Sequence, residues 1–319
     1  MKYSIGIDLG GTKCAVGLVD ANYNIIDKIS APTNREGSSE GIANDICALI
    51  RSLLEKNGKA LEDIEKIGVA VPGAVDVSGG EVIYSCNLPF RFFPLEKSLK
   101  SKLNFKNIKI ANDANAAALG EAVAGAAKGT YSSVMITLGT GVGGGVVIDG
   151  KLLVGKNGAA AELGHIVIEE NGKECSCTRH GCFEAYCGAP ALKKLTEEKI
   201  KEALARGVRS AMLDEIEGDF AKITTKTAFE ASKTGDATAL NVVREYAKYL
   251  ACGITNIINI FHPDVLTIGG GISGQGDYLL KLIVPIIERE QYTRDYENKT
   301  EIKIATLGND AGIIGAAAL

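Results

Sequence analysis

The stretch Tyr3–Asp20, which reads YSIGIDLGGTKCAVGLVD, contains two apolar runs separated by a Gly-Gly turn and predicts two strands joined by a tight connection. Residues 132–150, SSVMITLGTGVGGGVVIDG, repeat this order of strand, glycine turn and strand. Aligned without a gap, the stretches pair Asp8 with Thr137, Leu9 with Leu138, Gly10 with Gly139, Val19 with Ile148 and Asp20 with Asp149. The repeat indicates a duplicated α/β fold with a cleft between its two halves. The alternative is a chance similarity between two glycine-rich hairpins.

The remainder of the chain alternates predicted strands and helices. Apolar residues at helical spacing predict a helix over 40–56, and an alanine-rich segment predicts another over about 114–128. Further strands are expected at 64–71, 105–112 and 264–268, with mainly helical structure over 189–261 and a final strand, loop and small-residue helix. We expect a smaller N-terminal α/β domain from residues 1–113 plus 305–319, and a larger C-terminal α/β domain from residues 114–304.

The composition, with 46% hydrophobic and 23% charged residues over 319 positions, is that of a globular protein large enough for two domains. A formal net charge of -4 and a pI of about 5.6 argue against a nucleic-acid partner, because such proteins are usually basic. No apolar run of about 18 residues and no signal-peptide pattern occur, so we expect no membrane partner. Scattered cysteines around one cluster favour a cytoplasmic protein with a metal site over a disulfide framework.

Glycine turns follow several of the predicted strands. Asp8-Leu-Gly-Gly-Thr-Lys13 combines a carboxylate at a strand end with glycines, a hydroxyl and an ammonium group. Glycines allow backbone N–H groups to approach a phosphate, and Asp8 could hold Mg²⁺ through water. A plain hairpin turn is the alternative, but a second turn at 139–141 and a third at 269–271 favour a nucleotide.

The segment 139–144, GTGVGG, also matches the G-x-G-x-x-G fingerprint of dinucleotide-binding proteins. That fingerprint requires a helix directly after the glycines, because the helix N-terminus binds the pyrophosphate. The next residues, GVVIDGK, predict a strand and a turn, and the Gly-Lys-Ser/Thr order of a P-loop is missing from the sequence. We therefore regard the fingerprint match as weak.

Asp113 follows the predicted strand 105–112 and begins the alanine-rich helix, where unpaired N–H groups and the helix dipole keep a carboxylate ionised. One interpretation is an N-cap without a chemical role. The other is a base that accepts the proton of an attacking hydroxyl group. That role suits phosphoryl transfer, which depends mainly on positioning and charge stabilisation. Asn112 beside it could hold a hydroxyl group.

Three cysteines form a cluster in the middle of the chain: Cys175, Cys177 and Cys182. They predict a zinc site, which needs a fourth ligand, and the nearest nitrogen donors are His165 and His180. The spacing alone does not choose between these two histidines. Four-coordinate, thiolate-rich zinc is usually structural, because no position stays open for water. Glu162 and Glu184 nearby are either solvated surface charges or acceptors for sugar hydroxyl groups.

Together these motifs resemble the ROK family of sugar kinases and regulators, within the actin-like ATPase superfamily, over essentially the whole chain. The similar segments are DLGGTK (8–13) and TLGTGVGGG (137–145) for the phosphates, GGGIS (269–273) for the adenosine side, NDAN (112–115) for catalysis, and ELGH (162–165) with CSCTRHGCFE (175–184) for zinc and sugar. The resemblance implies two actin-like, ribonuclease-H-like α/β domains. Thr178 departs from the family, which usually has glycine after the second cysteine, so the local turn, rather than the ligand set, is expected to differ.

The resemblance also implies a role for each matching residue, with Asp113 as the catalytic base. The implied sugar contacts are Asn112, Glu162, His165, Glu184, Gly73 and Asn87. The implied nucleotide-binding residues are Asp8, Gly10, Gly11, Thr12, Lys13, Thr137, Gly139, Thr140, Gly141, Gly269, Gly270 and Gly271. The implied ligands of a structural zinc ion are His165, Cys175, Cys177 and Cys182, with the second ring nitrogen of His165 contacting the sugar.

The expected function is an ATP-dependent kinase that phosphorylates the 6-hydroxyl of glucose with ATP and Mg²⁺ in glycolysis, as in the bacterial glucokinases that the motifs resemble most. The alternatives are an N-acetylmannosamine or N-acetylglucosamine kinase, a non-catalytic sugar sensor of the same family, and a zinc- and nucleotide-dependent dehydrogenase. Asp113 and the three glycine turns favour catalysis over sensing, and the strand predicted after Gly144 disfavours the dehydrogenase. We expect a cytoplasmic homodimer or homotetramer without a helix-turn-helix domain, since the first strand begins near residue 3.

Overall fold

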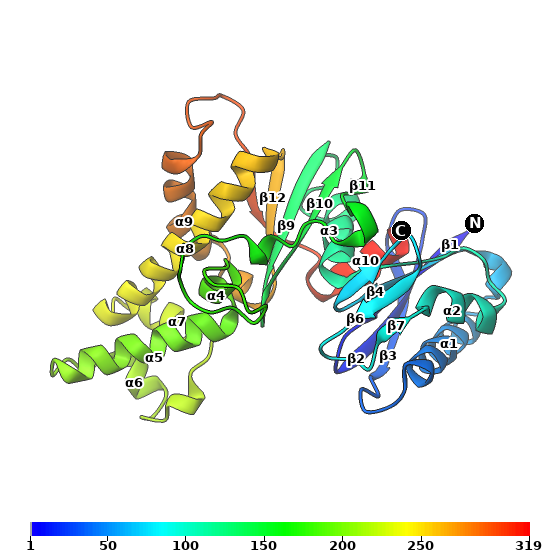
Figure 1. The fold of residues 1–319 in the computed structure, drawn as a ribbon, viewed down its shortest axis with the longest axis horizontal. Helices are drawn as coiled ribbons and strands as arrows, with labels where there is room; N and C mark the ends of the chain where they lie inside the picture. The colour runs from blue at the N-terminus through cyan, green and yellow to red at the C-terminus, as the bar shows by residue number, and fades with distance from the viewer. Residues whose placement is uncertain (1) are drawn as a thin grey trace. The chain divides into compact units, whose positions relative to one another are not determined.

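The computed structural model describes residues 2–319, which form two compact α/β units (Figure 1). The first unit contains the residues up to Met135, Gly144–Ala161 and Ala305–Leu319. The second contains Ile136–Gly143 and Glu162–Ile304. Residues 114–135 thus group with the first unit, whereas the division expected from the sequence assigns them to the C-terminal domain. A functional division into a smaller and a larger domain stays a prediction.

The first sheet has the strand order β3-β2-β1-β4-β8. Its strands are β1 (Tyr3–Leu9), β2 (Lys13–Val19), β3 (Ile25–Pro32), β4 (Ile64–Val71) and β8 (Ile108–Asn112). The first three pair antiparallel, whereas β1, β4 and β8 pair parallel. Parallel strands end at the same edge of a sheet, where α/β proteins commonly bind ligands. The first glycine turn, Gly73 and Asp113 therefore all follow strands at this edge.

The second sheet repeats that topology with the order β11-β10-β9-β12-β13. Its strands are β9 (Ser132–Leu138), β10 (Val142–Ile148), β11 (Lys151–Leu152), β12 (Val265–Gly269) and β13 (Glu301–Ile304). In each sheet the first strand in sequence (β1 or β9) lies in the centre. The next two strands extend the sheet on one side of it, and the two later strands extend it on the other side. The duplication predicted from the two hairpins is therefore confirmed. Strand β10 follows the second glycine turn directly, in place of the helix that a dinucleotide fingerprint requires.

A small third sheet and ten α-helices complete the described structure. The sheet consists of β5 (Ala74–Asp76), β6 (Glu81–Tyr84) and β7 (Arg91–Phe93). The helices are α1 (Ser39–Lys56), α2 (Leu95–Leu103), α3 (Asp113–Ala124), α4 (Glu184–Cys187), α5 (Ala189–Ala205), α6 (Ala211–Glu215), α7 (Thr227–Lys233), α8 (Ala237–Phe261), α9 (Asp277–Glu290) and α10 (Ala311–Ala318). Short 3₁₀ turns include Leu163–His165 and Gly271–Gln275.

The two faces of the first sheet are covered differently. Helices α1 and α2 lie against one face (Figure 1), and their leucines and isoleucines form one buried cluster with Ile5, Ile7 and Leu9 of β1. Helix α10 lies against the other face at glycines. A Cβ on Gly6 would lie 1.8 Å from the Ile313 carbonyl oxygen. The close approach of α10 brings its first residues to the strand ends, near the first glycine turn.

Helix α3 is shorter than the 114–128 predicted from its alanines, because it ends at Ala124. Glu121 causes this end: its buried carboxylate accepts a hydrogen bond from the Ala126 N–H at 2.7 Å and another from the Leu307 N–H at 2.8 Å. The carboxylate thus ties the turn after α3 to the segment before α10. Alanine content alone could not reveal a helix end that depends on a distant part of the chain.

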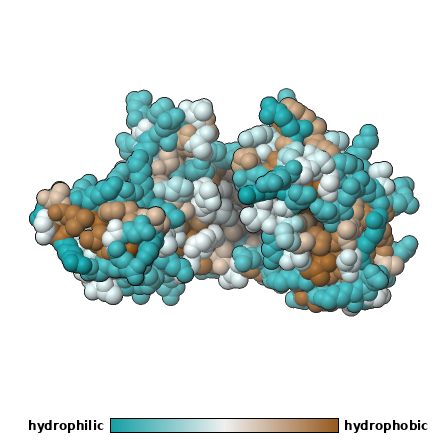
Figure 2. All heavy atoms as spheres, turned by 90° about the horizontal axis from the view of Figure 1, so that it is seen from below, coloured by the Kyte–Doolittle hydropathy of each residue, from teal (hydrophilic) through white to brown (hydrophobic). Residues whose placement is uncertain are grey.

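The face shown in Figure 2 is mostly hydrophilic, with separate smaller hydrophobic areas. Among residues 2–319, no helix has both the length and the apolar character needed to cross a membrane.

Candidate functional site

Two carboxylates lie close together at the strand-end edge of the first sheet. Asp8 is near the end of β1 and Asp113 follows β8. Burial, together with repulsion from Asp113, raises the pKa of Asp8 to about 6, and the nearby Lys13 ammonium partly opposes the shift. A half-buried pair of acids with one raised pKa is a frequent property of sites that bind a cation or transfer a proton.

Asn112, rather than Asp113, caps helix α3. The Asn112 Oδ1 atom accepts hydrogen bonds from the N–H groups of Ala114 and Asn115 at 2.9 and 3.2 Å, and its Nδ2 atom donates to the Gly73 carbonyl at 3.0 Å. Asp113 is the first helical residue, and its Oδ1 atom accepts from the Ala114 N–H at 2.9 Å. The N-cap interpretation of Asp113 is therefore wrong, because the preceding asparagine already performs that role.

The first glycine turn is a tight hairpin whose Gly10 is hydrogen-bonded through both its N–H and its carbonyl group. The Gly10 N–H donates to the Lys13 carbonyl at 2.9 Å, and the Thr33 hydroxyl donates to the Gly10 carbonyl at 2.8 Å. Asn87 lies against this turn, since a Cβ on Gly11 would be 3.1 Å from the Asn87 Cβ. Thr12 and Lys13 are exposed. The structure thus brings Asn87 to the predicted phosphate turn.

Two further glycines shape the same edge. Gly73 has φ +112°, and a Cβ there would lie 2.2 Å from the Tyr84 carbonyl oxygen, so only glycine fits. Gly312, at the start of α10, faces Asp8: a Cβ there would lie 2.9 Å from the carboxyl carbon. The sequence reasoning missed Gly312 and Thr33, and the small-residue helix at the end of the chain was the available signal for Gly312.

The second and third glycine turns meet in the second unit, where they follow the neighbouring strands β9 and β12. Gly270 has φ +83°, and a Cβ there would lie 2.4 Å from the Leu138 carbonyl oxygen. In the second turn the Gly139 N–H donates to the Gly141 carbonyl at 3.0 Å. Within residues 2–319, the N–H groups of Thr140 and Gly141 form no hydrogen bond with the protein. These two donors are therefore the ones left for a ligand.

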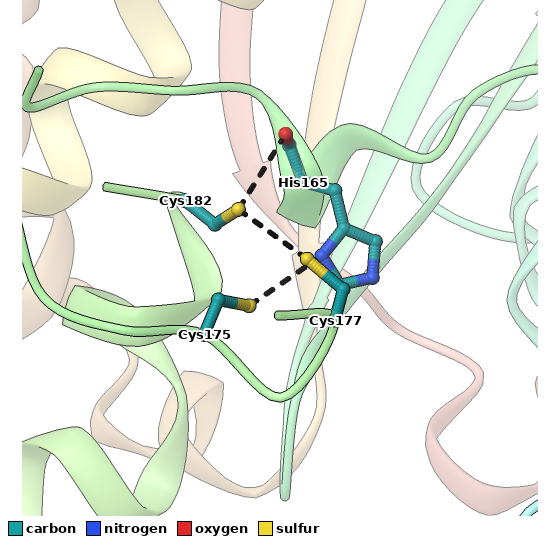
Figure 3. Close-up of side chains that lie close together, drawn as sticks. All are labelled: His165, Cys175, Cys177 and Cys182. Atoms are coloured by element: carbon teal, nitrogen blue, oxygen red, sulfur yellow. Dashed lines mark hydrogen bonds between the residues drawn. The ribbon is translucent and has the colours of Figure 1, made fainter. Parts of the chain in front are cut away.

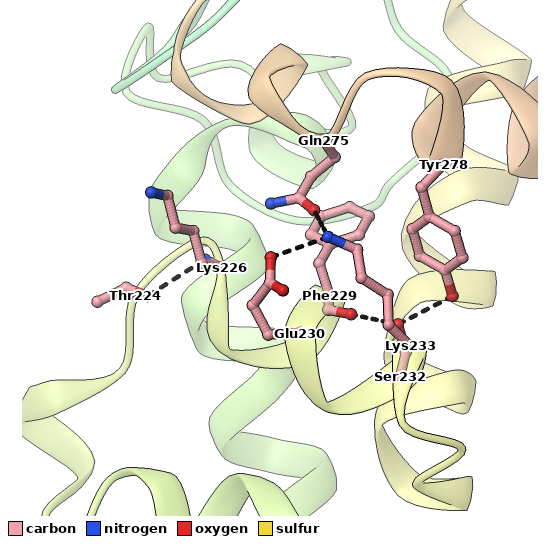
Figure 4. A network of polar contacts seen from close by, with 8 residues as sticks. All are labelled: Thr224, Lys226, Phe229, Glu230, Ser232, Lys233, Gln275 and Tyr278. Atoms are coloured by element: carbon pink, nitrogen blue, oxygen red, sulfur yellow. Dashed lines mark hydrogen bonds and ion pairs between the residues drawn. The ribbon is translucent and has the colours of Figure 1, made fainter.

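A polar network fixes the segment after the third glycine turn (Figure 4). The Lys233 ammonium donates to Gln275 Oε1 and to Glu230 Oε1, both at 2.9 Å. The hydroxyls of Ser232 and Tyr278 are 2.9 Å apart. Helix α7 thus holds the 3₁₀ turn Gly271–Gln275 on the side of the predicted adenosine contact. No local motif marks Lys233 or Gln275, and both were missed from the sequence.

Four predicted metal ligands converge in the second unit (Figure 3). The ligand atoms of His165, Cys175, Cys177 and Cys182 all lie within 4.8 Å of one another. His180 is exposed and lies in a backbone bridge with Glu174, outside this group. The choice between the two histidines, which the spacing left open, therefore falls on His165.

The distances within the cluster fit a tetrahedral zinc ion. Cys177 and Cys182 Sγ atoms are 3.7 Å apart, and Cys175 Sγ is 3.7 Å from His165 Nδ1. Tetrahedral bonds of about 2.3 Å to sulfur and 2.0–2.1 Å to nitrogen give S···S and S···N separations of about 3.8 and 3.6 Å. Nδ1 is the ring atom on the cluster side, so Nε2 is left for another partner.

One thiol of the cluster, Cys182, resists ionisation. Burial, together with hydrogen bonding to the neighbouring thiols, raises the pKa of Cys182 to about 12, whereas the Arg179 N–H lowers the pKa of the exposed Cys177. A divalent cation between the sulfurs would remove this resistance, because thiolates are the form that binds zinc. Thr178 beside them has φ +69°, so the residue that departs from the family lies in the left-handed region.

The two predicted glutamates have different surroundings. Glu162 is exposed, and its carbonyl accepts from the His165 N–H at 3.0 Å in a 3₁₀ turn. Glu184, at the start of α4, is half-buried; its Oε2 accepts from the Val142 N–H at 3.0 Å and its Oε1 from the Ser176 hydroxyl at 2.8 Å. The structure therefore places Glu184 against both the second glycine turn and the cysteine loop.

The duplicated sheet order and its glycine turns are those of the actin-like ATPase fold, which ROK proteins share. The sequence profile of the ROK family matches residues 4–319, and the chain belongs to that family. It is 37% identical over 318 residues to a glucokinase of Halalkalibacterium halodurans, across 98% of this chain and 93% of that protein. For a Thermotoga maritima glucokinase the identity is 36% over 318 residues, across 99% and 96%.

A solved structure shows the same fold. The ROK family glucokinase of Streptomyces griseus, in complex with glucose and AMPPNP, matches with a TM-score of 0.79 at 33% identity, across 99% of this chain and 98% of that chain. The motif-based assignment to the ROK family and the α/β fold class are therefore confirmed.

Proposed function

We propose that the protein is a glucokinase, which transfers the γ-phosphoryl group of ATP to the 6-hydroxyl of glucose. One observation carries the proposal: Asp113 starts helix α3 beside Asp8, while Asn112 performs the capping. A carboxylate so placed can take a proton from a hydroxyl group without weakening the helix. The names of the full-length relatives and the glucose and AMPPNP complex of the Streptomyces griseus protein support the same activity.

In this proposal Asp113 orients the 6-hydroxyl and accepts its proton, while the glycine turns hold the phosphates. Asp8 is the residue that would hold Mg²⁺ through water, because burial and the neighbouring Asp113 disfavour its ionised form, which a cation would stabilise. When bound, Mg²⁺ supplies charge neutralisation on the transferred phosphates. The N–H groups of Thr140 and Gly141 are the donors for phosphate oxygens in the second turn. The sugar contacts are Asn112, Gly73, Asn87, Glu162, His165 and Glu184.

We further propose that His165, Cys175, Cys177 and Cys182 hold a structural zinc ion. Four ligands leave no open position, so zinc supplies order to the loop rather than chemistry. The ring of His165 would then bind zinc through Nδ1 and a sugar hydroxyl through Nε2. We propose a cytoplasmic homodimer or homotetramer.

The activity is tested by ADP release from purified protein at fixed ATP and Mg²⁺ with a panel of hexoses. We expect the highest kcat/KM with glucose, and phosphorus NMR of the product should show a 6-phosphate. A higher kcat/KM for N-acetylmannosamine or N-acetylglucosamine would reassign the substrate. Sugar binding in calorimetry without ADP release for any hexose would instead indicate a sugar sensor.

The zinc proposal is tested by metal analysis of two histidine variants. We expect about one zinc per chain in the wild type and in His180→Ala, and loss of zinc in His165→Ala, because only His165 reaches the cluster. Zinc retained in His165→Ala but lost in His180→Ala would contradict the ligand set.

A further inference from the structure

Glu184 connects the cysteine loop to the second glycine turn through both of its carboxylate oxygens. Oε2 accepts from the Val142 N–H at 3.0 Å, and Oε1 accepts from the Ser176 hydroxyl at 2.8 Å. A Cβ on Gly141 would lie 2.2 Å from Oε2, so the turn touches this carboxylate closely. The two contacts hold Glu184 in one orientation between the loop and the turn.

The same turn is fastened a second time by the residues that follow Glu184. The Ala189 N–H donates to the Gly139 carbonyl at 2.8 Å. A Cβ on Gly188 would lie 3.1 Å from the carbonyl oxygens of both Glu184 and Thr140. The Val142 N–H is bound to Glu184, and both the N–H and the carbonyl of Gly139 are hydrogen-bonded. Between these two residues, the N–H groups of Thr140 and Gly141 stay available to a ligand. The position of Glu184 therefore decides how those donors are presented.

Ser176 is the side chain that orients Glu184 from the loop side. Cys175 Sγ also lies 3.7 Å from Glu184 Oε1, but a thiolate bound to a metal has no proton to donate. With a metal in the cluster, the Ser176 hydroxyl is the hydrogen-bond donor that remains on Oε1. Without it, the carboxylate can rotate and release the Val142 N–H.

We propose that Ser176 is a positioning residue for phosphoryl-donor binding, acting through Glu184 on the second glycine turn. The inference rests on the proposed kinase function and adds to it a route by which the cysteine loop influences ATP as well as sugar. Ser176 lies between Cys175 and Cys177. Neither zinc binding nor sugar binding by the loop requires a hydroxyl group at this position.

The test is calorimetric titration of the zinc-loaded protein with Mg²⁺ and AMPPNP, which does not depend on turnover. Ser176→Ala should weaken AMPPNP binding about 3- to 10-fold, the range expected for the net loss of one ordinary hydrogen bond, because Ser176 acts on the ligand only through Glu184. Ser176→Thr, which keeps the hydroxyl, should restore most of the affinity. Ser101→Ala, on an exposed face of α2, is the matched control and should bind like the wild type. Metal analysis should show unchanged zinc in every variant.

A double-mutant cycle separates positioning from a general loosening of the loop. In a Glu184→Ala background, Ser176→Ala should have no further effect on AMPPNP affinity, because its partner is gone. Unchanged affinity in Ser176→Ala, or an equal loss in the Glu184→Ala background, would overturn the inference. A wild type that binds AMPPNP but phosphorylates no hexose would overturn the proposed function. The effect of Ser176→Ala on AMPPNP affinity could still be measured in that case. A wild type that binds no AMPPNP would overturn both.

Discussion

The first and second glycine hairpins share the order of strand, glycine turn and strand, but they differ in the charge of their side chains. The first has Asp8 at the end of its leading strand, Lys13 after its turn and Asp113 nearby. The second has the neutral Thr137 at the position of Asp8, and its backbone is bound by Glu184. Both hairpins therefore have glycine turns, but only in the first do the leading strand and the residues around the turn contain ionisable side chains of their own. Under the proposed function, we therefore expect cation binding and proton transfer at the first hairpin, and phosphate binding by uncharged backbone N–H donors at the second.

The largest effect on turnover is expected for Asp113→Asn, which removes the proposed proton acceptor next to Asp8 of the first hairpin. Turnover of glucose should fall about 10²–10⁴-fold, the usual contribution of a general base. Sugar affinity in calorimetry should stay within a few-fold, because the amide keeps the shape of the carboxylate. Glu40→Gln changes another carboxylate in the first turn of a helix and should leave turnover unchanged. Near-full turnover in Asp113→Asn would remove this residue from the mechanism.

The next largest effect is on the free energy of unfolding, and it depends on the charge of Asp8 in the first hairpin. The folded pKa of Asp8 is raised from 3.8 to about 6, so ionised Asp8 destabilises the folded state. This cost is absent below about pH 3.8, grows as the pH rises through about 6, and then reaches about 3 kcal/mol at 1.4 kcal/mol per pKa unit. Asp8→Asn should therefore raise the free energy of unfolding at pH 7–8 when Mg²⁺ and ATP are absent.

Urea denaturation between pH 4 and pH 8 checks this expectation. The gain from Asp8→Asn should shrink as the pH falls, whereas Thr137→Val in the second hairpin should change stability equally at all pH values. A pH-dependent difference for Thr137→Val, or none for Asp8→Asn, would contradict the charge difference between the hairpins.

A smaller effect separates ligand-facing from packing glycines in the second unit. A Cβ on Gly139 meets nothing within 4 Å, whereas one on Gly270 would collide with Leu138. Gly139→Val should weaken AMPPNP binding about tenfold or more at unchanged Tm, since one hydrogen bond to a charged group is worth about 1.5–3 kcal/mol. Gly270→Val should lower the Tm itself. The same Tm loss in both variants would show that the second turn is a packing turn only.

The smallest effect is expected at Thr178, in the loop that supports the second hairpin through Glu184. Its φ of +69° is unfavourable for a β-branched residue. Thr178→Gly should stabilise the folded protein by about 1 kcal/mol, because glycine adopts this conformation without a steric penalty. Thr178→Ala is the matched control, since alanine keeps the Cβ and should give less than glycine. Thermal denaturation of the zinc-loaded protein measures both, and a destabilised Thr178→Gly would contradict the expectation.

The sequence by itself determined the duplicated α/β fold, the positions of the glycine turns and the cluster of cysteines that are candidate metal ligands. Each depends on short-range chemistry: alternation of apolar residues, the freedom of glycine, and the affinity of clustered thiols for zinc. The same chemistry argued against a dinucleotide site, because Val146, Val147 and Ile148 after the glycines are β-branched and belong to strand β10 rather than to a helix. These features are readable because neighbouring residues alone decide them.

Only the tertiary structure decided which of several equivalent groups is used. Asn112 and Asp113 are equally good caps, and the choice fell on Asn112 because β8 extends through it and Gly73 holds its amide. His165 and His180 are equally plausible ligands by spacing, but only His165 folds back onto the cysteines. The contact of Glu184 with Val142 joins segments far apart in the chain. Such choices depend on long-range packing, which local sequence patterns do not encode.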